Sequence, residues 1–547
     1  MMDWICSRIG SLRRVRPPGS RGWICSSCVA LLCLPAVLGC GRAPAGAAAD
    51  LEPPALPVIA LDEVAAFPLE AHVESADIAA GTWDLARLLE AGRLLFHTNY
   101  NGLDGVGIAR RPDGTVVDRF APAGPRGPGA QSCGSCHGFP VPAAAGLAHT
   151  QISSDPDQND TPPWNVRSVI SVFGNGILQR LAEEMTEELH RLRDEAAAEA
   201  KATPGTAARR ELAAKGIDFG AITATAYAAG EVSFDVSRLE GIDPDLVVRP
   251  FGWKGDTPNV RPFIAGPAIG GLGMQPEELL WKNPKSADVP DPDGDGVARE
   301  LSVGDITAMT VYDAAQETPA ELERLAALGL VAPPSPADVA RIAAGRAAFS
   351  SIGCAGCHVP EMRLEDTVFE EPTLRGGGNY HDAALAARDP GYDPARPFRF
   401  DLLTDAEAPR VEPHPEGGAI VRLYGDLKRH RMGRRLADPA GPSESGRADF
   451  DPVMHDGEKV MIPEDVFLTA ELWGVGNTGL WLHDGRAGTL REAVELHGED
   501  DPPGAGEAGR SEAQESRDAF GALSEGEQSA VIAFLKSLVT FSVSPSP

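Results

Sequence analysis

Two copies of the pentapeptide Cys-x-x-Cys-His constrain this chain more than any other feature. They are Cys133-Gly-Ser-Cys136-His137 and Cys354-Ala-Gly-Cys357-His358, in a chain with only 9 Cys and 12 His among 547 residues. This pentapeptide is the attachment site of a c-type haem, in which two thiols hold the porphyrin and the histidine binds the iron. A dithiol redox site or half of a zinc site needs no histidine after the second cysteine in both copies. The sequence therefore predicts two covalently attached haems c.

The N-terminal segment carries the pattern of an export signal, which attachment of haem c outside the cytoplasm requires. Five arginines accompany an apolar run, residues 23–38, that is too short for a comfortable membrane span. Residues 1–40 are therefore predicted to be a signal peptide. Val37-Leu38-Gly39-Cys40 resembles a lipobox, with ordinary cleavage near residues 45–49 as the alternative. We expect a periplasmic or outer-membrane lipoprotein that touches the membrane only through a lipid on Cys40.

The charge balance limits the partners. The formal net charge of the chain is −30. Such an acidic surface argues against nucleic acid and favours either a basic partner or none.

A short internal repeat divides the chain into halves. Ala-Gly-Arg-x-x-Phe occurs at residues 91–96 and again at 344–349, each time at the end of an apolar-periodic helix before a haem motif. After an Ala/Pro-rich tether at 41–80, this predicts a first haem domain at 81–330 and a second at 337–543. The predicted fold is mainly α, with two cytochrome c-like domains and long loop insertions. One insertion, the Gly/Pro-rich segment 97–130, separates the first helix from its haem motif.

Three further motifs carry a family resemblance. They are Phe-Gly-Trp-Lys at 251–254, Asp-Pro-Asp-Gly-Asp-Gly-Val at 291–297 and His-Asp-Gly-Arg-Ala at 483–487. With the two haem motifs, they make the chain resemble the bacterial di-haem cytochrome c peroxidase superfamily, and within it the branch of di-haem oxidoreductases. The resemblance runs from about residue 85 to 540.

The resemblance implies a division of labour between the haems. One six-coordinate haem receives electrons from a small c-type cytochrome or a cupredoxin, and the other offers an open iron to peroxide or another small oxidant. The expected function is thus that of a periplasmic, peroxidase-like oxidoreductase in which electrons enter at the second haem. An oxygenase or protein-oxidising enzyme on the same scaffold is one alternative, and a plain electron carrier is the other.

The sixth ligands are less sharply specified than the proximal histidines. Met432 is the first candidate for the second haem, since a thioether ligand raises the potential, although a core methionine is the ordinary interpretation. His430 and His483 compete for the same place, and we prefer to assign His483 a hydrogen bond in the haem pocket. For the first haem the candidates are His149, Met274 or an open iron.

Candidate catalytic residues follow from the resemblance. Family peroxidases place a glutamate after the glycine of a first-half repeat, where it moves a proton between the peroxide oxygens. Here the aligned position is Ala182, with Glu183 and Glu184 directly after it. These two become the candidates, with solvated helix positions as the alternative interpretation. Trp253 resembles the family tryptophan that bridges the haems.

One acidic loop has the beginning of a calcium site. Asp291, Asp293 and Asp295 alternate before a glycine, as in a calcium loop, and the family resemblance implies calcium between the haem domains. Position twelve is Ser302 rather than glutamate, so this is no EF-hand. Glu300 or Asp305 would have to complete the oxygen cage.

Overall fold

The computed structural model describes most of the chain after residue 71. The described ranges are 72–106, 130–138, 149–152, 165–227, 230–282, 286–292, 294, 296–377, 383–446, 452–500 and 509–542. All of them belong to a unit comprising residues 63–547, which is separate from residues 1–62. The predicted signal peptide at 1–40, with Cys40, lies outside the described residues, as do most of the tether at 41–80 and most of the loop at 97–130. Within the described ranges, no helix has both the length and the apolar character needed to cross a membrane.

The prediction of a mainly α fold is wrong. About 35% of the residues are helical and 18% lie in strands, and the described strands form several sheets of two or three strands each. The fold is therefore mixed α and β. The haem motifs specify only the short helical segments next to the cofactor, and the long insertions between those segments supply the strands. The domain boundaries at 81–330 and 337–543 stay a prediction.

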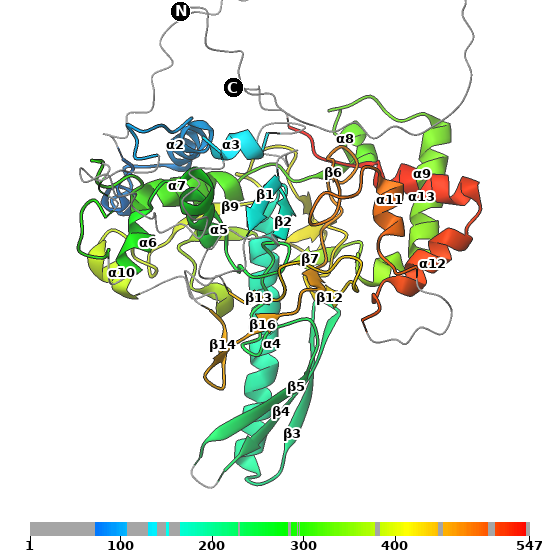
Figure 1. Cartoon of the computed structure of the whole chain (residues 1–547), viewed down its shortest axis with the longest axis horizontal. Coiled ribbons are helices and arrows are strands. Elements are labelled where there is room, and N and C mark those ends of the chain that lie inside the picture. Colours follow the sequence, from blue (N-terminus) through cyan, green and yellow to red (C-terminus); the bar gives the residue numbers. More distant parts are fainter. Residues whose placement is uncertain are drawn as a thin grey trace, which may run out of the picture. The chain divides into compact units, whose positions relative to one another are not determined.

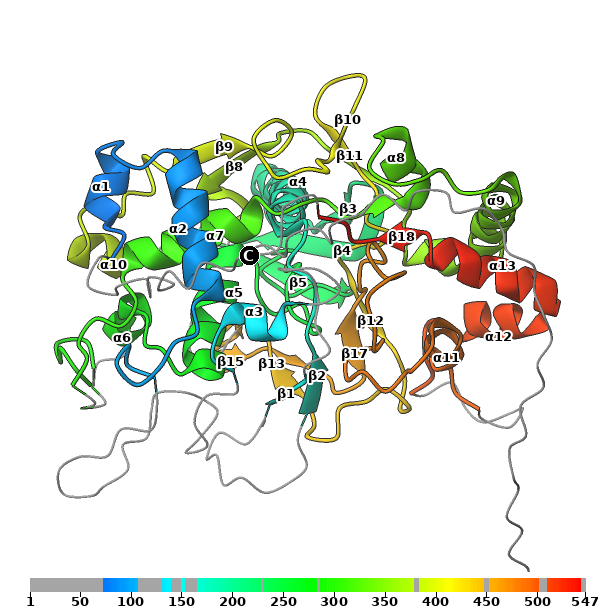
Figure 2. The same ribbon diagram turned by 90° about the horizontal axis from the view of Figure 1, so that it is seen from above.

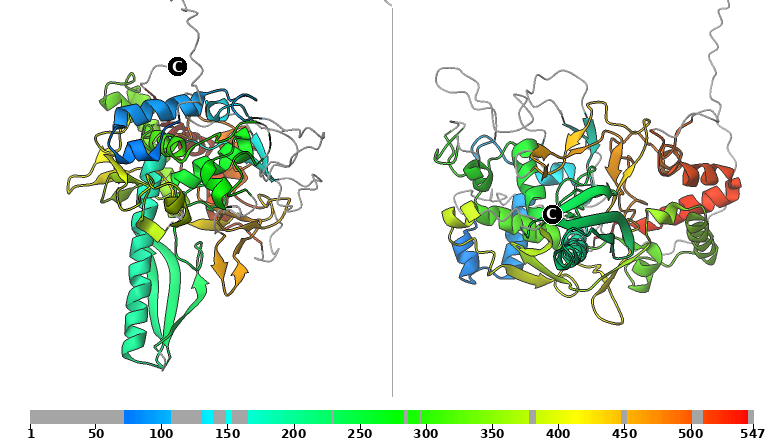
Figure 3. Two further views of the ribbon diagram at one scale, coloured as in Figure 1. Left: turned by 90° about the vertical axis from the view of Figure 1, so that its left-hand side faces the viewer. Right: turned by 90° about the horizontal axis from the view of Figure 1, so that it is seen from below.

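The largest sheet lies in the insertion after the first haem motif. Strands β3 (Ala208–Ala214), β4 (Ile217–Ala226) and β5 (Val232–Leu239) form an antiparallel sheet in the order β3-β4-β5. Buried and exposed side chains alternate along these strands, and the turn Lys215-Gly216 has positive φ at both residues, as a tight two-residue hairpin requires. The sheet packs along the long helix α4 (Asn175–Ala202), and both extend away from the remaining elements (Figures 1 and 3).

The internal repeat corresponds to two similar helix crossings. Helix α2 (Leu85–His97) crosses α7 (Val303–Ala314), and α9 (Pro336–Ser351) crosses α13 (Glu525–Leu535), at opposite sides of the view in Figure 2. Each crossing depends on the glycine of the repeat. A Cβ on Gly92 would collide with the carbonyl oxygen of Ala308, and one on Gly345 with that of Ala530. Only glycine allows the two backbones to approach so closely.

Each crossing carries its own buried core. A large cluster surrounds α2, α4 and α7 and includes Leu88, Leu181 and Val311, all fully buried. A smaller cluster joins Phe349 on α9 to Phe534 on α13. Helix α4 contributes an apolar stripe to the large cluster, with Leu178, Leu181, Met185 and Leu189 buried.

The remaining helical segments connect these crossings to the haem motifs. They are α1 (Ser75–Ala79), α3 (Cys133–Cys136), α5 (Val260–Pro267), η2 (Ala268–Leu272), α6 (Glu277–Lys282), α8 (Leu322–Ala327), η3 (Cys354–Gly356), η4 (Arg375–Gly377), α10 (Ala383–Arg388), α11 (Leu490–Glu495) and α12 (Gln514–Ala522).

The remaining strands pair in small antiparallel sheets, in the order β1-β2, β10-β11-β7, β12-β17, β13-β16, β14-β15, β18-β6 and β8-β9. Their bounds are β1 (His149–Ile152), β2 (Asn165–Ser168), β6 (Ala320–Glu321), β7 (Met362–Leu364), β8 (Val368–Glu371), β9 (Phe398–Asp401), β10 (Glu412–Pro413), β11 (Ala419–Val421), β12 (Arg429–Arg431), β13 (Ser443–Glu444), β14 (Met454–His455), β15 (Glu458–Lys459), β16 (Met461–Ile462), β17 (Val466–Leu468) and β18 (Leu538–Val539).

Candidate functional site

The second haem motif opens onto a cavity of about 370 Å³. Cys354, Cys357 and His358 follow α9 and line this cavity. Its other walls come from α11, α13 and the segment between β17 and α11, and they are mainly apolar. Apolar lining residues include Phe349, Leu472, Trp481, Leu490, Val494 and Leu535. A covalent porphyrin requires such a surface beside its cysteines, so these residues fit a haem c.

Both proximal histidines are held in the same way. Nδ1 of His358 lies 3.0 Å from the carbonyl oxygen of Tyr424, and Nδ1 of His137 lies 3.0 Å from that of Ile170. Because a carbonyl only accepts, each Nδ1 carries the proton and each Nε2 keeps its lone pair for a metal. Burial lowers the pKa of His358 to about 4, which keeps its ring neutral.

The four motif thiols suit thioether formation. Cys133, Cys136, Cys354 and Cys357 form no disulfide. Burial raises the pKa of the Cys133 thiol to about 12 and that of Cys354 to about 11, so both stay protonated at neutral pH.

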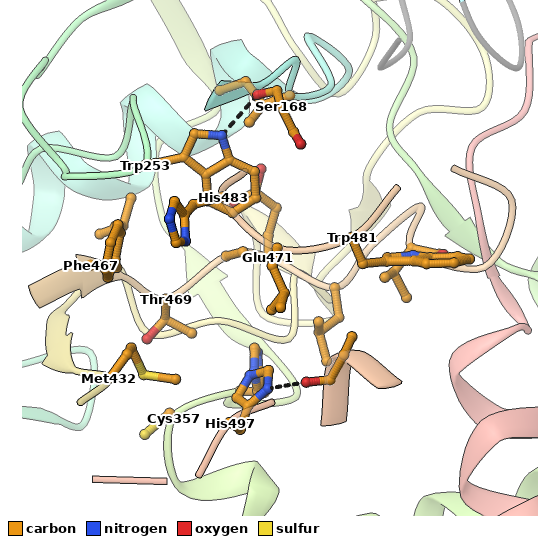
Figure 4. A pocket seen from close by; sticks show the side chains of 18 of the residues that line it. Ser168, Trp253, Cys357, Met432, Phe467, Thr469, Glu471, Trp481, His483 and His497 are labelled. Atoms are coloured by element: carbon orange, nitrogen blue, oxygen red, sulfur yellow. Dashed lines mark hydrogen bonds between the residues drawn. The ribbon is translucent and has the colours of Figure 1, made fainter. Parts of the chain in front are cut away.

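His497 faces the second proximal histidine across the cavity. Its Nδ1 donates to the carbonyl oxygen of Ala493 at 2.7 Å, which leaves Nε2 as the free acceptor. The ring centres of His358 and His497 lie 6.4 Å apart (Figure 4 shows His497 beside Cys357). Two imidazoles on opposite faces of one iron have ring centres about 6 Å apart, because a metal–nitrogen bond is about 2 Å long. His358 and His497 could therefore hold one haem iron between their rings.

The sequence interpretation missed His497. His497 lies in the turn two residues beyond the end of α11, where no periodic pattern in the sequence marks it. Met432 also lines the cavity, as Figure 4 shows, so its predicted role as sixth ligand stays a prediction.

His430 cannot serve as an iron ligand in this arrangement. Its Nδ1 bonds Glu512 at 2.7 Å and its Nε2 bonds Asp426 at 2.8 Å. Although burial lowers the pKa of His430, the hydrogen bonds to Asp426, Cys357 and Glu512 raise it to about 11. Both nitrogens are thus protonated, and neither offers a lone pair. Cys357, Asp426 and His430 also bring donor atoms within 4.8 Å of one another, but haem attachment would take up that thiol.

His483 belongs to a buried polar network at the cavity wall. Its ring stacks on Phe467 with centres 4.3 Å apart, and its Nε2 lies 3.7 Å from Asp438. Arg167 forms a bidentate pair with the same carboxylate, at 2.6 and 2.7 Å. Burial lowers the pKa of His483 to about 4, so the ring is neutral. The preference for His483 in the pocket rather than on the iron stays a prediction.

Trp253 lies at the wall of the second cavity. Its Nε1 donates to the carbonyl oxygen of Ser168 at 2.9 Å, and its side chain lines the cavity (Figure 4). Ser168 is two residues before Ile170, the residue whose carbonyl holds His137. A short, hydrogen-bonded segment thus links the first proximal histidine to the cavity of the second.

Lys254, next to Trp253, fixes this segment. Its Nζ donates to the carbonyl oxygens of Pro463, Glu464 and Val466 at 2.8 to 3.0 Å and lies 3.1 Å from Asp438. Burial lowers the pKa of Lys254 to about 8.

The first haem motif repeats the aromatic setting of the second. The ring of Phe96 lies 6.0 Å from that of His137, and that of Phe349 lies 6.3 Å from that of His358. Of the candidate ligands for the first haem, His149 lies in β1 but its side chain is outside the described residues. Met274 is fully buried in the large core cluster. The sixth ligand of the first haem stays a prediction.

The two candidate glutamates make contacts with protein side chains and backbone. Glu183 is buried and pairs with Arg180, and its carboxylate also accepts from Gln179 at 3.0 Å. Glu184 pairs with Lys215 at 2.6 Å. Neither lines the cavity of the second motif. Their catalytic role stays a prediction without support from these contacts.

The acidic loop is only partly described. Asp291 accepts hydrogen bonds from the backbone of Gly294 and Gly296, at 2.7 and 3.0 Å, while Asp293 and Asp295 lie outside the described residues. Glu300, one of the acids expected to complete the cage, already accepts from Gln275. Asp305, the other, accepts hydrogen bonds from the backbone N–H groups of Val73 and Ser302, and Ser302 is the N-cap of α7. Calcium binding stays a prediction.

Comparison with known families confirms the resemblance. Residues 417–538 match the family described as "Di-haem oxidoreductase, putative peroxidase". This region is similar to that of the di-haem oxidoreductases. The match contains Met432, His483 and His497, and it begins after the second haem motif. The predicted oxidoreductase character and haem cofactors agree with the di-haem family.

The curated proteins and the solved structures were also compared with the chain. No curated protein matches the chain. Among solved structures, the crystal structure of a MauG-like protein associated with microbial copper homeostasis matches at 13% identity. That match covers 67% of this chain and 89% of the other, with a TM-score of 0.27.

Proposed function

We propose that this di-haem oxidoreductase reduces a small oxidant such as peroxide at the first haem, with electrons that enter through the second. Haem iron supplies one-electron exchange and, at an open coordination position, reaction with an oxidant. Reduction of peroxide to water needs two electrons, while redox proteins deliver one at a time. Two cofactors held in one protein meet that need.

The observation that carries the proposal is the pair of histidines on either side of the second cavity. His358 and His497 would close both faces of one haem, and a closed haem exchanges electrons without binding oxidant. The link from Trp253 through Ser168 and Ile170 to His137 then leads away from this closed site toward the first motif.

The proposal extends to the electron donor and to the cellular location of the protein. We propose a small c-type cytochrome or a cupredoxin as the donor, and a periplasmic protein or an outer-membrane lipoprotein with its lipid on Cys40. The net charge of −30 supports a donor with a basic docking face.

A pair of variants tests the ligand assignment. We expect His497→Ala to convert the second haem from a low-spin to a high-spin spectrum, because an open position remains beside His358. Met432→Ala is the matched variant in the same cavity, and it should leave the low-spin signal unchanged. A near-infrared charge-transfer band of His/Met ligation that disappears in Met432→Ala would instead restore Met432 as the ligand. Electron paramagnetic resonance and near-infrared absorption measure both outcomes.

A further inference from the structure

The two helix crossings place corresponding residues of α7 and α13 in the same positions. Gly92 meets Ala308 and Tyr312 on α7, while Gly345 meets Ala530 and Phe534 on α13. The aromatic contacts correspond as well, with Phe96 and Tyr312 rings 5.5 Å apart and Phe349 and Phe534 rings 5.3 Å apart. Ala308 thus corresponds to Ala530 and Tyr312 to Phe534. The next residue on each helix is Asp313 in the first half and Leu535 in the second.

The position of Leu535 in the second half indicates what Asp313 faces in the first half. Leu535 is buried and lines the cavity of the second haem motif together with Cys354 and His358. By the correspondence, Asp313 turns toward the first haem motif. The electrostatics agree with this placement, because burial raises the pKa of Cys133 and the charge of Asp313 raises it further.

The Asp313 carboxyl is fully buried and only half satisfied. Oδ1 accepts a hydrogen bond from Nδ2 of Asn175 at 2.8 Å, whereas Oδ2 has no partner among the described residues. A buried carboxylate with one hydrogen bond is costly, and burial accordingly raises the pKa of Asp313 to about 8. The group is neutral at pH 7 and close to the point at which a nearby charge would ionise it.

The described part of the chain places the following charged and titratable groups around this end of α7. Helix α2 presents Arg93 and His97, α3 presents Cys133, and Tyr312 precedes Asp313 on α7 itself. Beyond the helix, Glu317 and Glu407 add negative charge. On α4 the neighbour is the neutral Asn175, which also lines the cavity of the second motif.

We propose that Asp313 takes up a proton when the first haem accepts an electron, so that reduction of this haem is coupled to protonation of a buried carboxyl. The electron comes from a one-electron donor and the proton from water. Ferric haem with a carboxylate thereby becomes ferrous haem with a carboxylic acid, and the local charge stays the same. The inference rests on the proposed function, because it requires a haem attached at Cys133 and Cys136.

The direction of the coupling follows from charge. The positive ferric centre favours the ionised carboxylate, and reduction removes that positive charge, so the proton affinity of Asp313 rises. Equally, a carboxylate stabilises the ferric form. The midpoint potential of the first haem should therefore fall as the pH rises from the pKa of Asp313 beside the ferric haem to its higher pKa beside the ferrous haem. At the second haem, Leu535 offers no such group.

Spectroelectrochemical titration of the holoprotein at several pH values tests the inference. In the wild type, the midpoint potential of the first haem should fall with rising pH while the second stays nearly constant. Asp313→Asn keeps the shape and the bond to Asn175, and it should make the first haem independent of pH. Asp313→Leu introduces the residue of the second half and should do the same. Infrared difference spectra should show a protonated carboxyl band upon reduction that is absent from both variants.

The outcomes separate the two proposals. If two haems are present and Asp313→Asn keeps the wild-type pH dependence of the first haem, the coupling to Asp313 is wrong. If the protein holds haem only at Cys354 and Cys357, the proposed function fails and this inference fails with it.

Discussion

Around the second haem motif, α13 presents Leu535 to an apolar cavity with a histidine on each side, whereas at the same place in the first half α7 presents the buried acid Asp313. The scaffold around the two motifs is otherwise alike, with a glycine at the helix crossing, a phenylalanine against the proximal histidine and a backbone carbonyl on its Nδ1. The repeated part of the structure is the part that would hold a haem in each half. The polar groups that differ are the ones that can give each haem its own chemistry.

Removal of the first attachment site should have the largest effect on the difference between the two halves. Cys133→Ala with Cys136→Ala should halve the covalent haem content and leave the spectrum of the closed second haem. The reason is that both thioethers of one porphyrin are lost while the second cavity is untouched. Acid-acetone extraction followed by haem quantification measures this result. Release of all haem from the wild type, or a stoichiometry of one, would contradict covalent attachment at both sites.

A buried ionic network joins residues of the two halves, and its loss should lower the stability of the protein. Asp438 pairs with Arg167 on β2 and lies beside Lys254, and all three side chains are almost fully buried. We expect Asp438→Ala to lower the free energy of unfolding by about 3–5 kcal/mol, because two cations would remain buried without their partner. Denaturant titration of the holoprotein measures the change. Asp438→Asn preserves the shape and isolates the loss of charge, and an unchanged midpoint in both variants would show that the network adds no stability.

Substitution of the glycine at each helix crossing should have a smaller effect on stability, of similar size in both halves. Gly92→Val and Gly345→Val should each cost about 1–3 kcal/mol or more, because the added side chain collides with the carbonyl of the facing helix. Gly521→Ala on α12 is the matched control, since nothing lies within 4 Å of its added Cβ, and it should be neutral or slightly stabilising. Thermal unfolding compares all three. A crossing that tolerates valine in one half only would show that the two halves do not share one packing geometry.

The sequence predicted the parts of the structure that follow from local chemistry. The haem motifs and the glycine repeat depend on short, specific patterns, and the structure places the glycines at the two helix crossings and the second motif at its cavity. The strands of the insertions were missed. Their alternating patterns are brief, and the turn Lys215-Gly216 was the one strong local signal for the largest sheet.

Distal residues depend on tertiary contacts that one sequence does not contain. Met432 was chosen for its residue type, and nothing in its neighbourhood of arginines indicated that His497 would face His358. The same holds for Glu183, whose pairing with Arg180 becomes evident only when α4 is buried. Asp313 was not noticed at all, because an acid in a helix is ordinarily exposed and its burial follows from the crossing with α2.

The central claim is that the second haem is closed and the first is open, and titration of the oxidised holoprotein with cyanide tests it most directly. Electron paramagnetic resonance should show that cyanide changes the spectrum of one haem only, the one held by His137. His137→Gly should remove that response and abolish peroxide turnover, while the second haem remains reducible by an external donor. Cyanide binding at the haem held by His358, with no change at the first, would reverse the assignment and contradict the account.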